Sequence, residues 1–247
     1  MSRVVLVTGA ASGIGRGLAL QFVQAGDRVA AFDYDGAGLD RLRAELDDGA
    51  LVTIAGDVGD AADVEACVSE TEARLGAVDV LINNAGTTGG PKATTTHETS
   101  VADFDRVTAT NIRGPFLLCR RVLPSMVARG RGVIVNIASV AGLVAFPGRA
   151  AYSVTKGALI QLTRAIAVDY ARQGVRAVAL CPGMIETPLT QWRLNDPTLR
   201  EEVLTRIPSH EFGAIADVVA AVKFLSSDAA AYFNGAALPM DGGYLAL

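Results

Sequence analysis

The sequence predicts an α/β fold in which one parallel β-sheet is covered by helices on both faces. Short apolar runs alternate along the chain with longer runs whose apolar residues recur at helical spacing. The short runs are apolar throughout rather than at every second position, which is typical of parallel strands buried on both faces. The chain has 247 residues and is 50% hydrophobic and 19% charged, so we expect a single domain spanning residues 1–247.

Seven apolar runs supply the predicted strands: Val4–Val7, Arg28–Phe32, Leu51–Ala55, Val78–Ile82, Gly132–Ile137, Val175–Leu180 and Ala237–Met240. Six amphipathic runs supply the predicted helices: Gly13–Ala25, Gly36–Asp47, Ala61–Leu75, Val101–Ala128, Ala151–Arg172 and Ile215–Leu225. Two of these helices, 101–128 and 151–172, carry apolar residues on more faces than packing on a sheet requires. The surplus suggests contacts between subunits.

Residues 183–212 break the alternation of strands and helices. They contain Pro188, Pro197 and Pro208, the single tryptophan and mixed charge. The segment is too long for a connecting turn. It is therefore expected to be either a lid over the substrate or a disordered insert.

Charge and cysteine content exclude several functional classes. The net charge is -4 and there is no run of Lys or Arg, so no basic footprint for nucleic acid or an anionic membrane is present. No apolar run is long enough to span a bilayer, and the first strand starts too early to leave room for a signal sequence. Three distant cysteines and two isolated histidines indicate neither a disulfide framework nor a metal site. We expect a cytoplasmic protein.

The first strand leads into a glycine-containing turn, Thr8–Gly15, where the first helix must begin. Glycines at positions 9, 13 and 15 let a diphosphate approach the backbone, and the helix N-terminus offers amide donors to it. Asp33 ends the second strand, where its carboxylate would accept hydrogen bonds from the adenosine ribose and repel a 2'-phosphate. No Arg or Lys stands at positions 11, 12 or 34, which favours NAD over NADP. The alternative is that Asp33 is a simple turn residue.

Tyr152 and Lys156 stand four residues apart on a predicted buried helix, so their side chains share one face. A free phenol has a pKa of about 10, and activity as a base near neutral pH requires a shift worth roughly 4 kcal/mol. A cation about 4 Å away at an effective dielectric constant near 20 supplies about that much. Ser139 ends the fifth strand and could hydrogen-bond a substrate oxygen, although it could equally cap a helix or turn.

Other polar residues follow the carboxyl ends of the predicted strands. Asp57 and Val58 follow the third strand, and Asn83–Gly86 follows the fourth. These are positions at which open α/β sheets bind ligands. Asn111 lies amid apolar residues of the long helix, where it is either functional or a core amide with its hydrogen bonds satisfied.

Taken together, these motifs resemble the short-chain dehydrogenase/reductase family. They are Thr8-Gly9-x-x-x-Gly13-Ile14-Gly15, Asn83-Asn84-Ala85-Gly86, Ser139, Tyr152-x-x-x-Lys156 and Pro182-Gly183, and they extend from one end of the chain to the other. The resemblance implies a Rossmann-type doubly wound sheet of seven parallel strands. It also implies NAD(P)-dependent interconversion of an alcohol and a ketone and a dimer or, more often, a homotetramer.

The resemblance also implies residue roles. Tyr152 would be the general base or acid, Lys156 would lower its pKa and bind the nicotinamide ribose, and Ser139 would hold the substrate oxygen. Asn111 would support a water relay toward Lys156. The residues expected to contact the cofactor are Gly9, Ser12, Gly13, Ile14, Gly15, Asp33, Asp57, Val58, Asn84, Tyr152, Lys156, Ile185 and Thr187.

A narrower resemblance concerns the substrate. The residues before Tyr152 and those of the lid are similar to a subfamily, the 2-(R)-hydroxypropyl-coenzyme M dehydrogenases, which oxidise a secondary alcohol with a sulfonate tail. By this match Arg149 and Arg193 would bind the sulfonate, with Trp192 beside them. Planar guanidinium groups satisfy sulfonate oxygens well. Alternatively, Arg149 faces solvent and Arg193 pairs with Glu186 or Asp196.

Three functions therefore compete. The first is an NAD-dependent dehydrogenase of a small secondary alcohol with an anionic tail. The second keeps the family and changes the substrate, to a 3-oxoacyl-thioester of an acyl carrier protein or to a sugar or polyol. The third is a non-catalytic dinucleotide sensor, which would not need the Asn111, Ser139, Tyr152 and Lys156 set.

Overall fold

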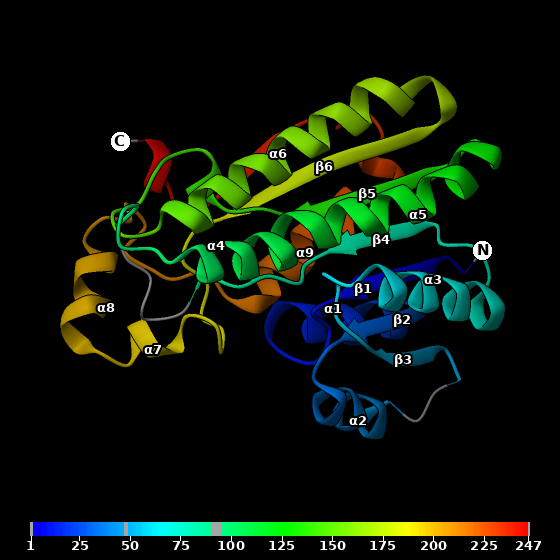
Figure 1. Cartoon of the computed structure of the whole chain (residues 1–247), viewed down its shortest axis with the longest axis horizontal. Coiled ribbons are helices and arrows are strands. Elements are labelled where there is room, and N and C mark those ends of the chain that lie inside the picture. The colour runs from blue at the N-terminus through cyan, green and yellow to red at the C-terminus, as the bar shows by residue number, and fades with distance from the viewer. Residues whose placement is uncertain (1, 47–48, 90–94, 247) are drawn as a thin grey trace.

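The computed structural model describes residues 2–46, 49–89 and 95–246. Its centre is a seven-stranded sheet in the order β3-β2-β1-β4-β5-β6-β7, in which all neighbouring strands are parallel (Figure 1). The predicted fold class is thus confirmed. The strands are β1 Val4–Thr8, β2 Arg28–Asp33, β3 Leu51–Ala55, β4 Val80–Asn83, β5 Gly132–Ile137, β6 Val175–Pro182 and β7 Ala237–Met240.

Helices cover both faces of the sheet and bury two large apolar clusters. The main helices are α1 Gly13–Gln24, α2 Gly36–Glu45, α3 Ala61–Leu75, α4 Val101–Thr108, α5 Gly114–Ala128, α6 Ala150–Tyr170 and α9 Ile215–Leu225. Side chains of α1, α2 and α9 pack on one face, and those of α3, α5 and α6 pack on the other. Because the strands alternate their side chains between the faces, continuous apolar runs fill both clusters.

Several predicted elements have different limits in the structure, mostly by one or two residues. The run Val101–Ala128 is helical throughout but contains a π-helical turn at Ala109–Arg113, between α4 and α5. Helix α2 ends at Glu45, and the predicted end at Asp47 lies outside the described residues. Strand β4 begins at Val80, two residues after the predicted start at Val78, although the backbone of Asp79 already hydrogen-bonds to Val4 and Val133 of the neighbouring strands.

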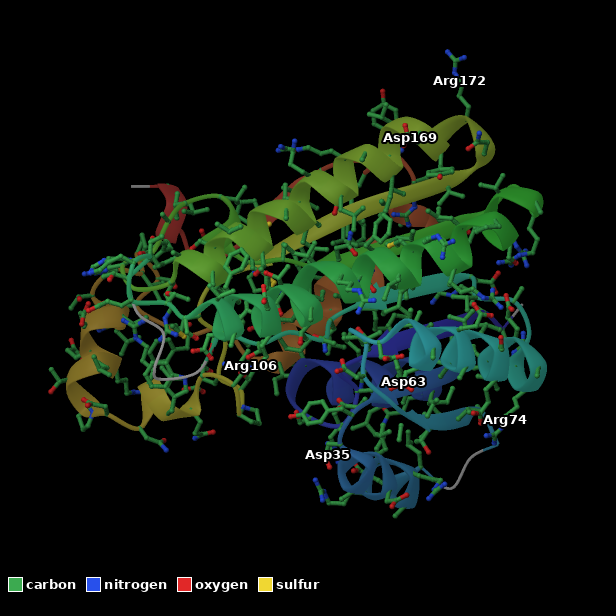
Figure 2. All side chains as sticks on the ribbon, in the orientation of Figure 1. Asp35, Asp63, Arg74, Arg106, Asp169 and Arg172 are labelled. Atoms are coloured by element: carbon green, nitrogen blue, oxygen red, sulfur yellow. The ribbon has the colours of Figure 1, made fainter. Side chains whose placement is uncertain are left out.

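Helix α6 is long and extends from one end of the molecule toward the other. It has 21 residues, begins beside the segment that holds α7 and α8, and ends near Arg172, which projects away from the protein (Figure 2). Helices α7 Gln191–Leu194 and α8 Pro197–Leu204 belong to residues 183–212, so the structure gives this segment regular elements. They lie at the end of the molecule opposite the N-terminus (Figure 1).

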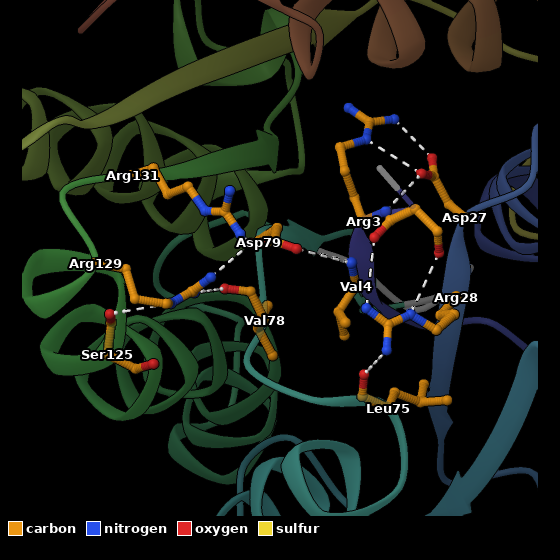
Figure 3. A network of polar contacts seen from close by, with 11 residues as sticks. Arg3, Val4, Asp27, Arg28, Leu75, Val78, Asp79, Ser125, Arg129 and Arg131 are labelled. Atoms are coloured by element: carbon orange, nitrogen blue, oxygen red, sulfur yellow. Dashed lines mark hydrogen bonds and ion pairs between the residues drawn. The ribbon is translucent and has the colours of Figure 1, made fainter.

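A network of arginine and aspartate contacts fixes the amino ends of the central strands (Figure 3). The carboxylate of Asp79 accepts the backbone N–H of Val4 at 3.0 Å and pairs with Arg129 at 2.5 Å. Arg3 pairs with Asp27 at 2.6 Å. The network therefore sets the register of β1 against β2 and β4 at the edge opposite the strand carboxyl ends.

No helix of the described residues is long and apolar enough to cross a membrane.

Candidate active site

The carboxyl ends of the parallel strands meet at one edge of the sheet, where open α/β sheets bind ligands. A cavity of about 630 Å³ lies at this edge. Its walls include all the residues predicted to contact the cofactor except Gly15: Gly9, Ser12, Gly13, Ile14, Asp33, Asp57, Val58, Asn84, Tyr152, Lys156, Ile185 and Thr187.

The turn between β1 and α1 depends on its glycines for two different reasons. Gly9 and Gly13 have φ angles of 66° and 52°, a left-handed conformation that side chains disfavour. Gly15 does not line the cavity, and its contact with the cofactor stays a prediction. A Cβ at position 15 would lie 1.9 Å from the carbonyl oxygen of Gly9, and the glycine is therefore required by close packing of α1 on the turn.

The amino end of α1 is suited to an anion. Ser12 is its N-cap residue and forms no side-chain capping hydrogen bond. The N–H groups of the first helical turn thus have no side-chain oxygen to accept from them, and they lie beside the cavity. Such a helix end favours a phosphate group. These residues fit a dinucleotide.

Asp33 is held in the cavity wall by two backbone hydrogen bonds. The residue is 7% exposed. Its Oδ2 accepts the N–H of Ala11 at 2.9 Å, and its Oδ1 accepts the N–H of Asp35 at 2.9 Å. The contact with Asp35 is the one a turn residue makes, but the contact with Ala11 ties the carboxylate to the glycine turn. Each oxygen keeps a lone pair that can accept from a ligand hydroxyl.

Asn84 and Thr8 join the glycine turn to the loop after β4. The Nδ2 of Asn84 donates to the carbonyl oxygens of Thr8 at 2.9 Å and Gly9 at 3.2 Å. The Oγ1 of Thr8 accepts the N–H groups of Asn84 and Ala85, each at 3.0 Å. Sequence reasoning assigned no such role to Thr8, although its place at the end of β1 was a usable signal.

Ser139, Tyr152 and Lys156 converge between β5 and the first turns of α6. The side chains of Ser139 and Tyr152 both line the cavity, and that of Ser139 is close enough to lower the pKa of Tyr152. Lys156 is 4% exposed, and its Nζ lies 5.7 Å from the centroid of the Tyr152 ring. The same Nζ donates to the carbonyl oxygen of Ile137 at 2.7 Å. The structure thus brings the predicted trio together.

The pKa values of the two buried groups move in opposite directions. Burial lowers the pKa of Lys156 to about 8. Burial raises the pKa of Tyr152, while the hydrogen bond with Ser139 and the positive charge of Arg149 oppose that rise. The lowering of this pKa by Lys156 stays a prediction; its Nζ donates to the carbonyl oxygen of Ile137 and keeps its positive charge.

Asn111 lies in the π-helical turn and is 1% exposed. Its Oδ1 accepts the N–H of Thr87 at 2.8 Å, and its Nδ2 donates to the carbonyl oxygen of Thr87 at 2.9 Å and to Thr155 Oγ1 at 3.0 Å. The amide therefore fixes the loop after β4 to α6. A Cβ on Gly86 would lie 3.4 Å from Asn111 Oδ1 and 3.5 Å from Lys156 Nζ, so both groups border the same glycine.

A smaller cavity of about 150 Å³ lies on the other side of Tyr152. It shares Ser139 and Tyr152 with the larger cavity, and its walls include the three residues predicted to bind substrate, Arg149, Trp192 and Arg193. The guanidinium of Arg149 lies over the Trp192 ring, 5.1 Å from its centroid. The two arginines are close enough for the charge of Arg193 to lower the pKa of Arg149, after the larger effect of burial.

The carboxylates proposed as alternative partners of Arg193 are engaged elsewhere. Glu186 pairs with Arg200 at 3.2 Å. Asp196 caps α8 by accepting the N–H groups of Thr198 and Leu199. Arg193 has no ion pair among the described residues, and its buried Nε has no hydrogen-bond partner there.

Residues from the end of the chain also line this cavity, and sequence reasoning missed them. Tyr244 stacks on Phe146 with ring centroids 5.7 Å apart, and Asp241 lies beside it in the cavity wall. Near the end of the chain the sequence predicts only the strand Ala237–Met240. No local pattern could have placed Tyr244 here, because the contact joins residues about a hundred positions apart.

Comparison with known proteins agrees with this geometry. A family model described as enoyl-(acyl carrier protein) reductase matches residues 9–245. The 2-(R)-hydroxypropyl-CoM dehydrogenase of Xanthobacter autotrophicus is 54% identical over 250 residues, which cover 100% of both chains. The chain belongs to the short-chain dehydrogenase/reductase family.

Solved structures of short-chain dehydrogenases superpose along the whole chain. Levodione reductase is 37% identical with a TM-score of 0.93, and the match covers 99% of this chain and 98% of that one. The 3-ketoacyl-(acyl-carrier-protein) reductase of Brucella melitensis, solved with NADH, is 36% identical with a TM-score of 0.88, covering 98% of each chain. The chain is therefore an oxidoreductase that acts on CH–OH groups, and the prediction of an enzyme rather than a sensor is confirmed.

Proposed function

We propose that this enzyme oxidises 2-(R)-hydroxypropyl-coenzyme M to 2-oxopropyl-coenzyme M with NAD as the hydride acceptor. The observation that carries the proposal is the placement of Arg149 and Arg193 in the cavity beside Tyr152. A relative named for this activity is 54% identical over the full length, which supports the same substrate.

The charge balance of the small cavity favours an anionic substrate tail. Arg149 and Arg193 face the same space, and the pKa of Arg149 is lowered first by burial and then by the like charge of Arg193. A third arginine of the wall, Arg206, is already paired with Glu202 at 3.2 Å. A buried guanidinium donor without a partner costs about 1–3 kcal/mol. A sulfonate, anionic at any physiological pH, would satisfy the free donor of Arg193 and offset both charges.

The reaction at the alcohol follows from the residues between the two cavities. Ser139 and Tyr152 hold the alcohol oxygen, and the Tyr152 phenolate accepts the hydroxyl proton as the C–H bond gives up its hydride. Bound NAD+ supplies the hydride acceptor. Lys156 would bind the nicotinamide ribose of the cofactor, and Asn111, which fixes the loop after β4, would support a water relay to the lysine. The products are the ketone, NADH and one proton.

Asp33 supports NAD as the cofactor rather than NADP. Its buried carboxylate would accept from the adenosine ribose hydroxyls and repel a 2'-phosphate. The neighbouring Asp35 also lines the cavity. It pairs with Arg41 at 3.5 Å, and both side chains of this pair are exposed to solvent. The other expected cofactor contacts are the residues that line the larger cavity.

The second candidate is a reductase of 3-oxoacyl thioesters or a sugar or polyol dehydrogenase. Its support is a 36% identical 3-ketoacyl-(acyl-carrier-protein) reductase. The net charge of -4 argues against docking of an acidic carrier protein, and neutral sugars would leave the two arginines unused. We further propose a homotetramer in the cytoplasm, built as a single domain with residues 183–212 as its substrate lid.

The test compares two alcohols in two proteins. NADH formation is measured from 2-(R)-hydroxypropyl-coenzyme M and from 2-butanol, with the wild type and an Arg149→Ala, Arg193→Ala double variant. We expect the wild type to prefer the sulfonate strongly and the double variant to lose at least 100-fold of that preference, since two charge-assisted contacts are removed at about 1.5–3 kcal/mol each. Arg200→Ala, which removes an arginine from the same segment outside the cavity, is the matched control. Equal preference in wild type and double variant would refute the proposed substrate.

A further inference from the structure

Arg149 and Tyr152 are neighbours in the structure as well as in the sequence. Arg149 is the N-cap residue of α6, and Tyr152 lies in the first turn of that helix. Both side chains line the 150 Å³ cavity. The stacking on Trp192 holds the guanidinium on the cavity side rather than in solvent.

The position of Arg149 is unfavourable for the helix. A helix N-terminus carries a partial positive charge and prefers an anionic or neutral cap. Arg149 gives no side-chain capping bond there, and it also faces the like charge of Arg193. Helix stability therefore does not explain why a cation stands at this position.

We propose that Arg149 is a positioning residue for catalysis, whose charge stabilises the phenolate of Tyr152, and that an anionic substrate tail weakens this effect when it binds. The first half is independent of the substrate. The second half rests on the proposed function, because it requires an anion at Arg149.

The other charged and titratable groups around Tyr152 do not replace Arg149. Lys156 keeps its charge while it donates to the carbonyl oxygen of Ile137, so it would act on the phenol alongside Arg149 and not replace it, and Arg206 is paired with Glu202. The oxygens of Asp241 accept the backbone N–H groups of Gly243 and Leu245. Ser139 is an uncharged group that lowers the pKa of the phenol, and the charge of Arg193 lowers the pKa of Arg149. Burial raises the pKa of the Cys181 thiol to about 11, so this thiol stays neutral at physiological pH. Arg149 is the charge that lowers the pKa of Tyr152 against the effect of burial.

A chemical consequence follows for substrates with and without a negative tail. With a neutral alcohol the guanidinium charge acts on the phenol in full. A sulfonate bound to Arg149 offsets that charge, so deprotonation of Tyr152 requires a higher pH. For unit charges roughly 6–8 Å apart at an effective dielectric constant near 20, the interaction corresponds to about 1.5–2 pH units, and the partial exposure of Arg149 to solvent reduces this to about one.

The first experiment measures kcat/KM for 2-butanol oxidation against pH at saturating NAD. We expect the alkaline midpoint of Arg149→Met to lie about one pH unit above that of the wild type, and Arg149→Lys to restore most of the difference, because it returns the charge. Arg172→Met is the matched control, since it removes an arginine from the far end of α6, where the side chain projects into solvent (Figure 2). NADH binding by fluorescence checks that each variant is folded. A midpoint for Arg149→Met within 0.2 units of the wild type would overturn the proposal.

A second experiment needs no variant. Saturating ethanesulfonate is added to wild-type 2-butanol oxidation as the detached tail of the proposed substrate. We expect the midpoint to rise toward that of Arg149→Met, whereas an unchanged midpoint overturns the coupling to the anion. If the variant shifts the midpoint but the enzyme shows no preference for a sulfonate alcohol, the proposed function fails and the role of Arg149 stands.

Discussion

Replacement of Asp33 by Asn tests the cofactor site most directly. The two carboxylate oxygens each accept one backbone N–H, from Ala11 and Asp35. An asparagine offers one oxygen and one NH2 group, so one of these N–H groups would face another donor. The charge that should accept from the ribose is lost as well. A hydrogen bond to a charged group contributes about 1.5–3 kcal/mol, and 1.4 kcal/mol corresponds to tenfold.

We therefore expect the dissociation constant of NADH to rise about 10- to 100-fold in Asp33→Asn. Quenching of protein fluorescence by NADH measures it, with Asp40→Asn as the control because Asp40 is exposed on α2 and pairs with Arg43 at i,i+3. Turnover with NADP should be far below turnover with NAD in the wild type, and the ratio should approach one in the variant. An affinity change below twofold, or equal use of both cofactors by the wild type, would contradict the argument.

Three further predictions address chemistry, packing and pH. Tyr152→Phe should keep NADH binding and lose about 10²- to 10⁴-fold in turnover, the usual contribution of a general base, as measured by NADH formation. Thr155→Val should lower the free energy of unfolding in urea by about 1–3 kcal/mol, because the Asn111 amide loses a buried partner. Burial raises the pKa of Cys67 and Cys119 from 9.0 to about 12. The unfolded chain therefore releases these protons at lower pH than the folded protein, and the free energy of unfolding should fall as the pH rises from 9 to 12. Between pH 8 and pH 10, the free energy of unfolding of each Cys→Ala variant should fall by about 1.4 kcal/mol less than that of the wild type, as measured by urea unfolding.

The sequence alone supports the fold and most of the cofactor cavity because both depend on local patterns. Continuous apolar runs predict the buried parallel strands, and Gly9, Gly13 and Asp33 stand where strand ends must bring them together. The packing role of Gly15 needed coordinates, because only they show that a Cβ at this position would lie 1.9 Å from the carbonyl oxygen of Gly9. The π-helical turn at 109–113 leaves no mark in apolar spacing, since it changes the backbone bonding rather than the buried face.

The small cavity is where the sequence is least informative. The pairing of Glu186 depends on how α8 is oriented, and only the structure shows that Arg200 rather than Arg193 reaches it. Tyr244 reaches Phe146 from the other end of the chain. Such contacts are set by tertiary packing between segments whose own sequences do not specify each other.

Local rules are broken in this protein at positions that border the two cavities. The cation Arg149 occupies the N-cap position of α6, and Lys156 is only 4% exposed. A π-helical turn interrupts the helix that carries Asn111. Each feature costs stability: dipole repulsion at Arg149, desolvation at Lys156 and poorer backbone geometry around Asn111. Away from the cavities, the strands and helices follow the ordinary rules and supply two large apolar clusters. These clusters stabilise the fold enough to hold the unfavourable groups in place, and this is why the unfavourable groups mark the site of the chemistry.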